Sequence, residues 1–153
     1  WLDVIKFNVG YSIDINNFLI SKMIKLKKKM NIVHISSISS LNSDKSLDGF
    51  VGKIPYASSK AYLNSYVKSI SKIYAKDGIR INCILPGVMM NKGKFWDKIK
   101  NDNPKKFNNF VKLNYPSGTV GKLEDVANLV LFTSSTKVDF LNGSLIQADG
   151  GSF

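Results

Sequence analysis

The chain has 153 residues, 44% of them hydrophobic, which suits one domain with a sizeable core and excludes two ordinary domains or a disordered chain. Its formal net charge is +11, and almost all of the basic residues are lysine, with Arg80 the only arginine. Because sites that read phosphate favour the arginine fork, this charge indicates a solvated lysine surface rather than a nucleic-acid site.

The single cysteine, Cys83, excludes an internal disulfide framework and a zinc site built from cysteines, which fits a reducing cytoplasm. No stretch approaches the run of roughly 18 apolar residues that a membrane span requires. The opening residues WLDVIKFNV do not have the pattern of a signal peptide. We therefore expect a cytoplasmic protein whose partners include neither a membrane nor a nucleic acid.

In chain order, the first predicted element is a helix from about residue 8 to residue 30. Its apolar residues cover more than one face, which favours burial on two sides. The run NIVHIS (31–36) predicts a buried strand, because it is short, β-branched and followed by a polar loop. That loop continues to about Pro55.

A second helix is expected after Pro55, with Gly78 as its stop. The run IRINCIL (79–85) predicts another strand, which Pro86-Gly87 breaks at once. After a polar and aromatic stretch to about Gly121, we expect a helix over 124–134 and a last strand at SLIQAD (144–149). This alternation of helices and strands predicts an α/β fold with parallel strands.

The motif YASSK places Tyr56 and Lys60 four residues apart at the start of a helix, so both side chains share one face. An ammonium near a phenol stabilises the phenolate, which suits proton transfer to or from a carbonyl or alcohol oxygen. The spacing alone is common on helix surfaces. The serines of ISSIS and the Pro86-Gly87 turn, however, follow strands whose carboxyl ends are the place where open α/β sheets bind ligands.

Taken together, WLDVIKFNVG, NIVHISS, YASSKAYL, GIRINCILPG and NGSLIQADGG resemble the short-chain dehydrogenase/reductase family, in particular its 3-oxoacyl-ACP reductase type. The resemblance covers essentially the whole chain. It implies a single domain over residues 1–153, the C-terminal catalytic part of a doubly wound, Rossmann-like αβα sandwich with a parallel sheet. The glycine-rich phosphate loop would then precede Trp1, and we expect residues 1–153 alone to be poorly folded and inactive.

The resemblance also implies catalytic and substrate-binding roles. Tyr56 would be the general acid/base, Lys60 would bind the nicotinamide ribose, and Asn8 would anchor a water in the proton relay. Ser37, together with Tyr56, would hold the substrate oxygen. The segment between Ser37 and Tyr56 is longer than is common in the family, which indicates an insertion and leaves Ser36 and Ser39 as alternatives to Ser37.

For the cofactor, the resemblance implies NAD or NADP, bound by Tyr56, Lys60 and the segment after the second strand. The backbone after Pro86 and Gly87, chiefly Val88 and Met89, would face the nicotinamide carboxamide. Asn91 stands where the family often has threonine, and its amide would serve the same purpose. We expect Cys83 to be a small buried core residue and His34 to pack in the core or at a sheet edge, and we expect no metal site.

The implied reaction is hydride transfer between the nicotinamide and a small-molecule ketone or secondary alcohol, such as a 3-oxoacyl thioester or a sugar-derived carbonyl. A homodimer or homotetramer built through the two long helices and the C-terminal strand region is expected. The alternatives are a catalytically silent assembly or binding protein with this fold, a lysine-rich nucleic-acid binder, and a dehydratase or epimerase that uses the same tyrosine and lysine.

Overall fold

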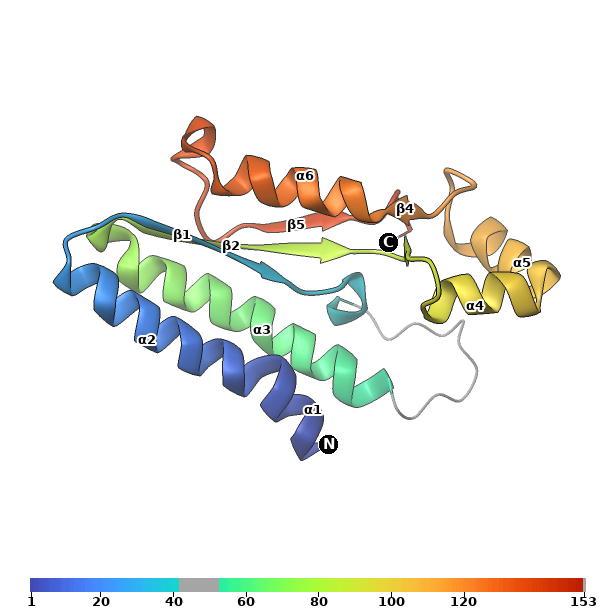
Figure 1. Cartoon of the computed structure of the whole chain (residues 1–153), viewed down its shortest axis with the longest axis horizontal. Helices are drawn as coiled ribbons and strands as arrows, with labels where there is room; N and C mark the ends of the chain where they lie inside the picture. Colours follow the sequence, from blue (N-terminus) through green and yellow to red (C-terminus); the bar gives the residue numbers. More distant parts are fainter. Residues whose placement is uncertain (42–52, 153) are drawn as a thin grey trace.

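The computed structural model describes residues 1–41 and 53–152. A three-stranded parallel sheet in the order β1-β2-β5 forms the middle layer (Figure 1). Its strands are β1 (Met30–Ile35), β2 (Ile79–Pro86) and β5 (Leu145–Ala148). The register runs from Met30 opposite Ile79 in the first pair and from Cys83 opposite Leu145 in the second. All three strands were predicted, and no predicted bound differs from the observed one by more than one residue.

Two long helical segments lie side by side on one face of this sheet (Figure 1). The first passes from α1 (Leu2–Ile5) through the π-helical turn η1 (Lys6–Gly10) into α2 (Tyr11–Lys25). The helix expected over residues 8–30 therefore begins earlier and also ends earlier, because Met30 already belongs to β1.

The second long helix, α3 (Lys53–Tyr74), is followed by the 3-10 turn η3 (Ala75–Asp77). Gly78 ends this segment with a φ of 72°, a left-handed conformation that glycine adopts without strain. The stop predicted at Gly78 is thereby confirmed. The insertion predicted before Tyr56 falls mainly on residues 42–52, which lie outside the described residues.

The opposite face of the sheet is covered by α6 (Leu123–Ser134), which leads into the short turn η4 (Thr136–Val138) (Figure 1). Helices on both faces of a parallel sheet make the three-layer αβα arrangement, so the predicted fold class is confirmed. The central strand β2 is buried over most of its length, as expected for a strand covered on both faces.

Between β2 and α6, where the sequence indicated a polar and aromatic stretch, the chain forms a lobe. It contains β3 (Met89–Met90), α4 (Phe95–Asp102), α5 (Pro104–Asn114) and β4 (Gly121–Lys122), and β3 pairs with β4 in parallel. Helix α5 begins where Asn103 accepts a hydrogen bond from the Lys106 N–H at 2.9 Å, with Pro104 as its first residue.

The main core lies between the sheet and the helices α2 and α3, and each of its fully buried aliphatic side chains contributes about 1.5–3 kcal/mol. It is built from Ile20 of α2, Val67 and Ile70 of α3, and Ile79, Ile81, Cys83 and Leu85 of β2. A second cluster in the lobe consists of Phe107, Val111 and Tyr115, against which Trp96 and Phe110 pack.

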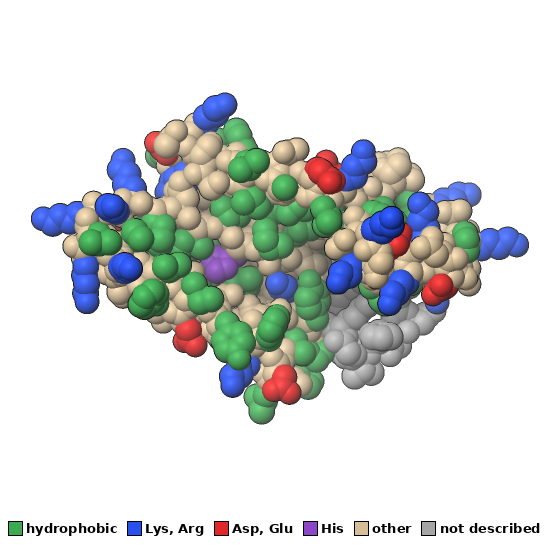
Figure 2. All heavy atoms as spheres, viewed as in Figure 1, with side chains coloured by type: hydrophobic (Ala, Val, Ile, Leu, Met, Phe, Trp, Pro, Cys, Tyr) green, Lys and Arg blue, Asp and Glu red, His purple; other side chains and the backbone are tan. Residues whose placement is uncertain are grey.

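Burial of the first long helix on two sides is not observed in this chain. Helix α2 buries Asn16 and Ile20, whereas Ile15 and Phe18 are 57% and 67% exposed. Among the described strands, β1 pairs with β2 alone, so its other edge is open. Figure 2 shows hydrophobic side chains gathered across the middle of this side of the molecule, where β1 runs in Figure 1.

Within the described ranges, 1–41 and 53–152, no helix has both the length and the apolar character that crossing a membrane requires.

Candidate active site

The carboxyl ends of the three parallel strands meet at one rim of the sheet, the position where open α/β sheets bind their ligands. At this rim the Ser36 N–H donates to the Ile84 carbonyl at 2.8 Å, and the Gly87 N–H donates to the Ala148 carbonyl at 2.9 Å. These bonds extend the ladder beyond the strands, so the segments that carry Ser37 and Gly87 leave the sheet from neighbouring strands.

Tyr56 and Lys60 lie one helical turn apart near the N-terminal end of α3. The ammonium of Lys60 donates to the backbone carbonyl of Ile35 at 2.8 Å and lies 5.7 Å from the centroid of the Tyr56 ring. Tyr56 is 39% exposed, so its ring remains accessible beside this cation. Burial lowers the pKa of Lys60, while the nearby Cys83 thiol has a smaller, opposite effect. The two residues therefore meet at the end of β1.

Asn8 lies in the π-helical turn η1, a distortion that occurs frequently at functional sites. Its side-chain amide donates to the Ser59 hydroxyl at 3.1 Å, and this hydroxyl donates to the Tyr56 carbonyl at 2.7 Å. Asn8 is therefore connected to the turn of α3 that carries Tyr56. Sequence reasoning missed Ser59, which is only 1% exposed, although it stands inside YASSK between the two candidate catalytic residues.

The candidate serines differ in their surroundings. Ser36 is buried, and its hydroxyl donates to the Lys60 carbonyl at 3.2 Å, so its side chain faces α3. Ser37 is half-buried and caps the short 3-10 turn η2 (Ile38–Ser40), where its hydroxyl accepts a hydrogen bond from the Ser39 N–H at 3.2 Å. Ser39 is also half-buried. The hydroxyls that remain partly accessible at the rim are thus those of Ser37 and Ser39.

Gly87 allows an unusually close approach of two chain segments. A Cβ atom at this position would lie 2.9 Å from the Asp149 Cα, which no side chain can tolerate. The Val88 N–H donates to the Tyr115 hydroxyl at 2.8 Å, and the Val88 carbonyl accepts from the Gly121 N–H at 3.0 Å. Because the Val88 N–H is used inside the protein, a ligand at this turn would have to use Met89 and Asn91. Sequence reasoning missed Tyr115, since no local pattern marks it.

Cys83 is a core residue, and His34 is half-buried on β1, an edge strand of the described sheet; both positions agree with the predictions. The Asn16 amide donates to Nε2 of His34 at 2.9 Å and to the Tyr66 hydroxyl at 3.3 Å. Burial, assisted by the positive charge of Lys60, lowers the pKa of His34 to about 4. Cys83 is fully buried, and burial raises its pKa to about 11. In the part of the chain that the structure describes, no group of three His, Cys, Asp or Glu residues could hold a metal.

A parallel sheet with helices on both faces, and with hydroxyl, phenol and ammonium groups at its carboxyl rim, defines a Rossmann-type α/β domain. The family model described as enoyl-(acyl carrier protein) reductase matches residues 6–152. The chain therefore belongs to the short-chain dehydrogenase/reductase family, as the sequence motifs predicted.

Two curated relatives illustrate the similarity. The 3-oxoacyl-[acyl-carrier-protein] reductase FabG of Chlamydia muridarum is 34% identical over 154 residues, which cover 99% of this chain and 56% of the relative. The 7alpha-hydroxysteroid dehydrogenase of Paraclostridium sordellii is 32% identical over 152 residues, which cover 99% of this chain and 52% of the relative. The chain thus spans about half the length of the curated relatives it matches.

Solved structures are also similar to this chain in fold. A 4-hydroxyisoleucine dehydrogenase mutant complexed with NADH and succinate has a TM-score of 0.84 and 25% identity, covering 97% of this chain and 57% of that one. ElxO with NADP bound has a TM-score of 0.80 and 25% identity, covering 95% of this chain and 54% of that one.

Proposed function

We propose that the whole protein is an NAD(P)-dependent oxidoreductase that interconverts a small-molecule ketone and a secondary alcohol, with Tyr56 as the general acid/base. The observation that carries this proposal is the position of the Lys60 ammonium, held by the Ile35 carbonyl next to the exposed ring of Tyr56. A cation in this position stabilises the phenolate that remains after the phenol has given up its proton. The relatives named above are reductases and dehydrogenases, which supports the same reaction class.

The residues at the rim fit the nicotinamide end of a dinucleotide. An ammonium group has three donors, so Lys60 has donors beyond the one directed at Ile35 with which to bind ribose hydroxyls. Gly87 lets the backbone pass close to Asp149, and Met89 and Asn91 follow it along the chain. When bound, the nicotinamide would donate or accept the hydride. Structures of two relatives hold NADH or NADP, so the proposal covers either cofactor.

Residues of this chain would then transfer the proton, hold the substrate oxygen and position the phenol. In reduction the Tyr56 hydroxyl gives its proton to the substrate oxygen, and in oxidation the phenolate takes that proton back. The Ser37 hydroxyl holds the same substrate oxygen. Asn8 acts through Ser59, whose hydroxyl donates to the Tyr56 carbonyl and so holds the turn that carries the phenol.

The proposal is tested by Tyr56→Phe in the whole protein, which removes one hydroxyl from an exposed ring and should leave folding and cofactor binding unchanged. We expect kcat to fall far more than tenfold, where tenfold corresponds to about 1.4 kcal/mol of barrier. The matched control is Tyr62→Phe, an exposed tyrosine on the same helix, which should keep wild-type kcat. If Tyr56→Phe keeps more than a tenth of kcat, the acid/base role is wrong.

We further propose that residues 1–153 alone do not bind a dinucleotide. They contain no glycine-rich phosphate loop, and among the described strands β1 has an open edge, which favours aggregation. Fluorescence titration of the isolated chain with NADH and NADPH should show no saturation. Saturable micromolar binding by a soluble chain that unfolds cooperatively would contradict this expectation.

A further inference from the structure

Asn64 continues the row of polar residues that begins with Tyr56 and Lys60. The three follow one another at intervals of four residues on α3, so each lies about one helical turn beyond the last and on the same side. Lys60 reaches the last residue of β1. Asn64 is only 6% exposed. A buried amide requires hydrogen-bond partners, and those of Asn64 belong to two other elements.

Asn64 joins the central strand β2 to the turn η2. On one side its side-chain carbonyl accepts a weak hydrogen bond from the buried Cys83 thiol, with Sγ and Oδ1 3.7 Å apart. On the other side its amide donates to the Ser40 hydroxyl at 2.7 Å. Burial raises the pKa of Cys83 to about 11, so the thiol keeps the proton that it donates. These two contacts orient the side chain so that its N–H groups face η2.

Ser40 connects Asn64 to Ser37. The Ser40 hydroxyl donates to the Ser37 carbonyl, and the Ser40 N–H donates to the same carbonyl at 3.0 Å. The Ser37 hydroxyl accepts from the Ser39 N–H, which occupies a lone pair and leaves the hydroxyl proton to be donated to a substrate oxygen. The buried amide on α3 is therefore linked through one hydroxyl to the backbone of Ser37.

We propose that Asn64 and Ser40 are positioning residues, which hold η2 so that the Ser37 hydroxyl lies in place for the substrate oxygen. This inference rests on the proposed function, in which Ser37 holds that oxygen. A donor stabilises an oxygen that gains negative charge only when it stands roughly 2.7–3.1 Å from it. Misplacing a group by about 1 Å can cost on the order of a hundredfold in rate. The Ser40 N–H still holds the Ser37 carbonyl when the side-chain contacts are lost, so we expect a smaller loss, of about tenfold in kcat.

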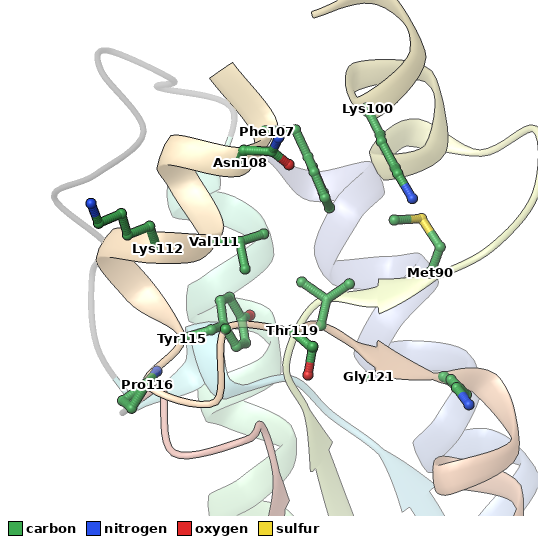
Figure 3. A pocket seen from close by; sticks show the side chains of 13 residues that line it. Met90, Lys100, Phe107, Asn108, Val111, Lys112, Tyr115, Pro116, Thr119 and Gly121 are labelled. Carbon is green, nitrogen blue, oxygen red and sulfur yellow. The ribbon is translucent and has the colours of Figure 1, made fainter. Parts of the chain in front are cut away.

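The lobe between β2 and α6 contains a pocket of about 770 Å³, and neither Asn64 nor Ser40 lines it. Figure 3 shows the side chains of Phe107, Val111 and Tyr115 around this pocket. A molecule bound there would meet the same walls after either residue is replaced. The hydrogen bond from Lys60 to β1 does not involve η2 either. The loss should therefore appear in kcat and not in the Kd for the dinucleotide.

The test measures kcat and the Kd for NADH and NADPH in variants of the whole protein. Ser40→Ala should lower kcat about tenfold, whereas Ser40→Thr, which keeps the hydroxyl, should stay close to wild type. Asn64→Ala should lower kcat at least as much as Ser40→Ala. All three should keep the wild-type Kd for both dinucleotides. Ser65→Ala, an exposed serine next to Asn64 on α3, is the matched control and should change neither quantity.

A second control separates positioning from general destabilisation, because Asn64→Ala leaves buried groups without their partner. Asn16→Ala also removes a buried asparagine, one whose amide is hydrogen-bonded to His34 and Tyr66. It should lower the free energy of unfolding, measured in urea, by a similar amount and leave kcat unchanged. If Asn16→Ala reduces kcat as much as Asn64→Ala does, the loss reflects destabilisation and the inference is overturned.

The decisive comparison uses Ser37→Ala as the background. If Asn64 and Ser40 act through Ser37, adding Asn64→Ala or Ser40→Ala to Ser37→Ala should lower kcat little further. An additive loss overturns the inference, and so does wild-type kcat in both single variants or a Kd for the dinucleotide that rises as kcat falls. If Ser37→Ala itself keeps wild-type kcat, the role proposed for Ser37 fails together with this inference. The acid/base role of Tyr56 is tested separately, by Tyr56→Phe.

Discussion

The Lys60 ammonium donates a hydrogen bond to the Ile35 carbonyl at 2.8 Å, which joins α3 to the last residue of β1. The position of the ammonium next to Tyr56 therefore depends on where β1 ends, and not on the helix alone. The Lys60 carbonyl makes a second connection, because it accepts a hydrogen bond from the Ser36 hydroxyl. Strand and helix thus hold Lys60 at both its side chain and its backbone.

Lys60→Ala should remove activity and also weaken binding of the dinucleotide, because it deletes both the cation near Tyr56 and the proposed ribose contact. Lys68→Ala, an exposed lysine two turns further along α3, is the matched control and should change neither quantity. The measurements are kcat and the Kd for NADH and NADPH. Wild-type cofactor affinity in Lys60→Ala would rule out the ribose contact.

Replacing the serines one at a time should separate a structural hydroxyl from a functional one. Ser37→Ala should lower kcat strongly with little change in stability, since Ser37 is half-buried at the rim. Ser36→Ala should lower the free energy of unfolding by about 1 kcal/mol, because its buried hydroxyl donates to the Lys60 carbonyl, and should reduce kcat less. Steady-state kinetics and urea unfolding measure these effects. If Ser39→Ala has the largest effect on kcat, the substrate oxygen is held there instead.

His34 should make the protein less stable in mild acid. Its pKa is about 4 in the folded protein and about 6.5 when unfolded, so the folded state favours the neutral ring. This contribution is fully present above pH 6.5 and is lost as the pH falls from about 6.5 to 4, by about 1.4 kcal/mol per pH unit. Urea unfolding at several pH values, compared with His34→Asn, measures it. The same pH dependence in both proteins would contradict the assignment.

Tyr115→Phe should disturb the turn at the end of β2, because the Tyr115 hydroxyl accepts a hydrogen bond from the backbone of that turn. Loss of the hydroxyl leaves the Val88 N–H without the partner that it has at 2.8 Å, which costs about 1–3 kcal/mol of stability if water does not replace it. We also expect weaker dinucleotide binding, because Met89 and Asn91 follow directly. Thermal unfolding and a cofactor titration test this, with Tyr62→Phe as the control. Unchanged stability and unchanged cofactor affinity would show that the Val88 contact is dispensable.

The exposed side of α2 should be a contact between copies of the protein. Ile15 and Phe18 expose more than half of their surfaces on this helix, and exposed apolar residues grouped in this way are typical of interaction surfaces. Phe18→Glu should shift the whole protein from a dimer or tetramer toward the monomer in sedimentation at micromolar concentration. Asn17→Glu, exposed on the same helix, adds an equal charge and should have a smaller effect. A wild-type protein that is entirely monomeric would contradict the prediction.

The sequence by itself determined the elements whose patterns are local. The run IRINCIL specifies a strand, and Pro86 and Gly87 specify its end. The spacing of Tyr56 and Lys60 places them on one face of any helix, because the helical period does not depend on the surroundings. Gly78 ends its helical segment for a similar reason, since few other residues adopt a left-handed φ without strain.

Only the tertiary structure decided which polar groups meet. The hydrogen bond from Asn8 to Ser59 spans 51 positions and that from Val88 to Tyr115 spans 27, so no local sequence pattern could predict either bond. Ser36 and Ser37 are adjacent and chemically identical, and only the packing of α3 against β1 makes one buried and leaves the other at the rim. Contacts between distant segments depend on how whole elements pack, and the periodicity of a single segment contains no information about its neighbours.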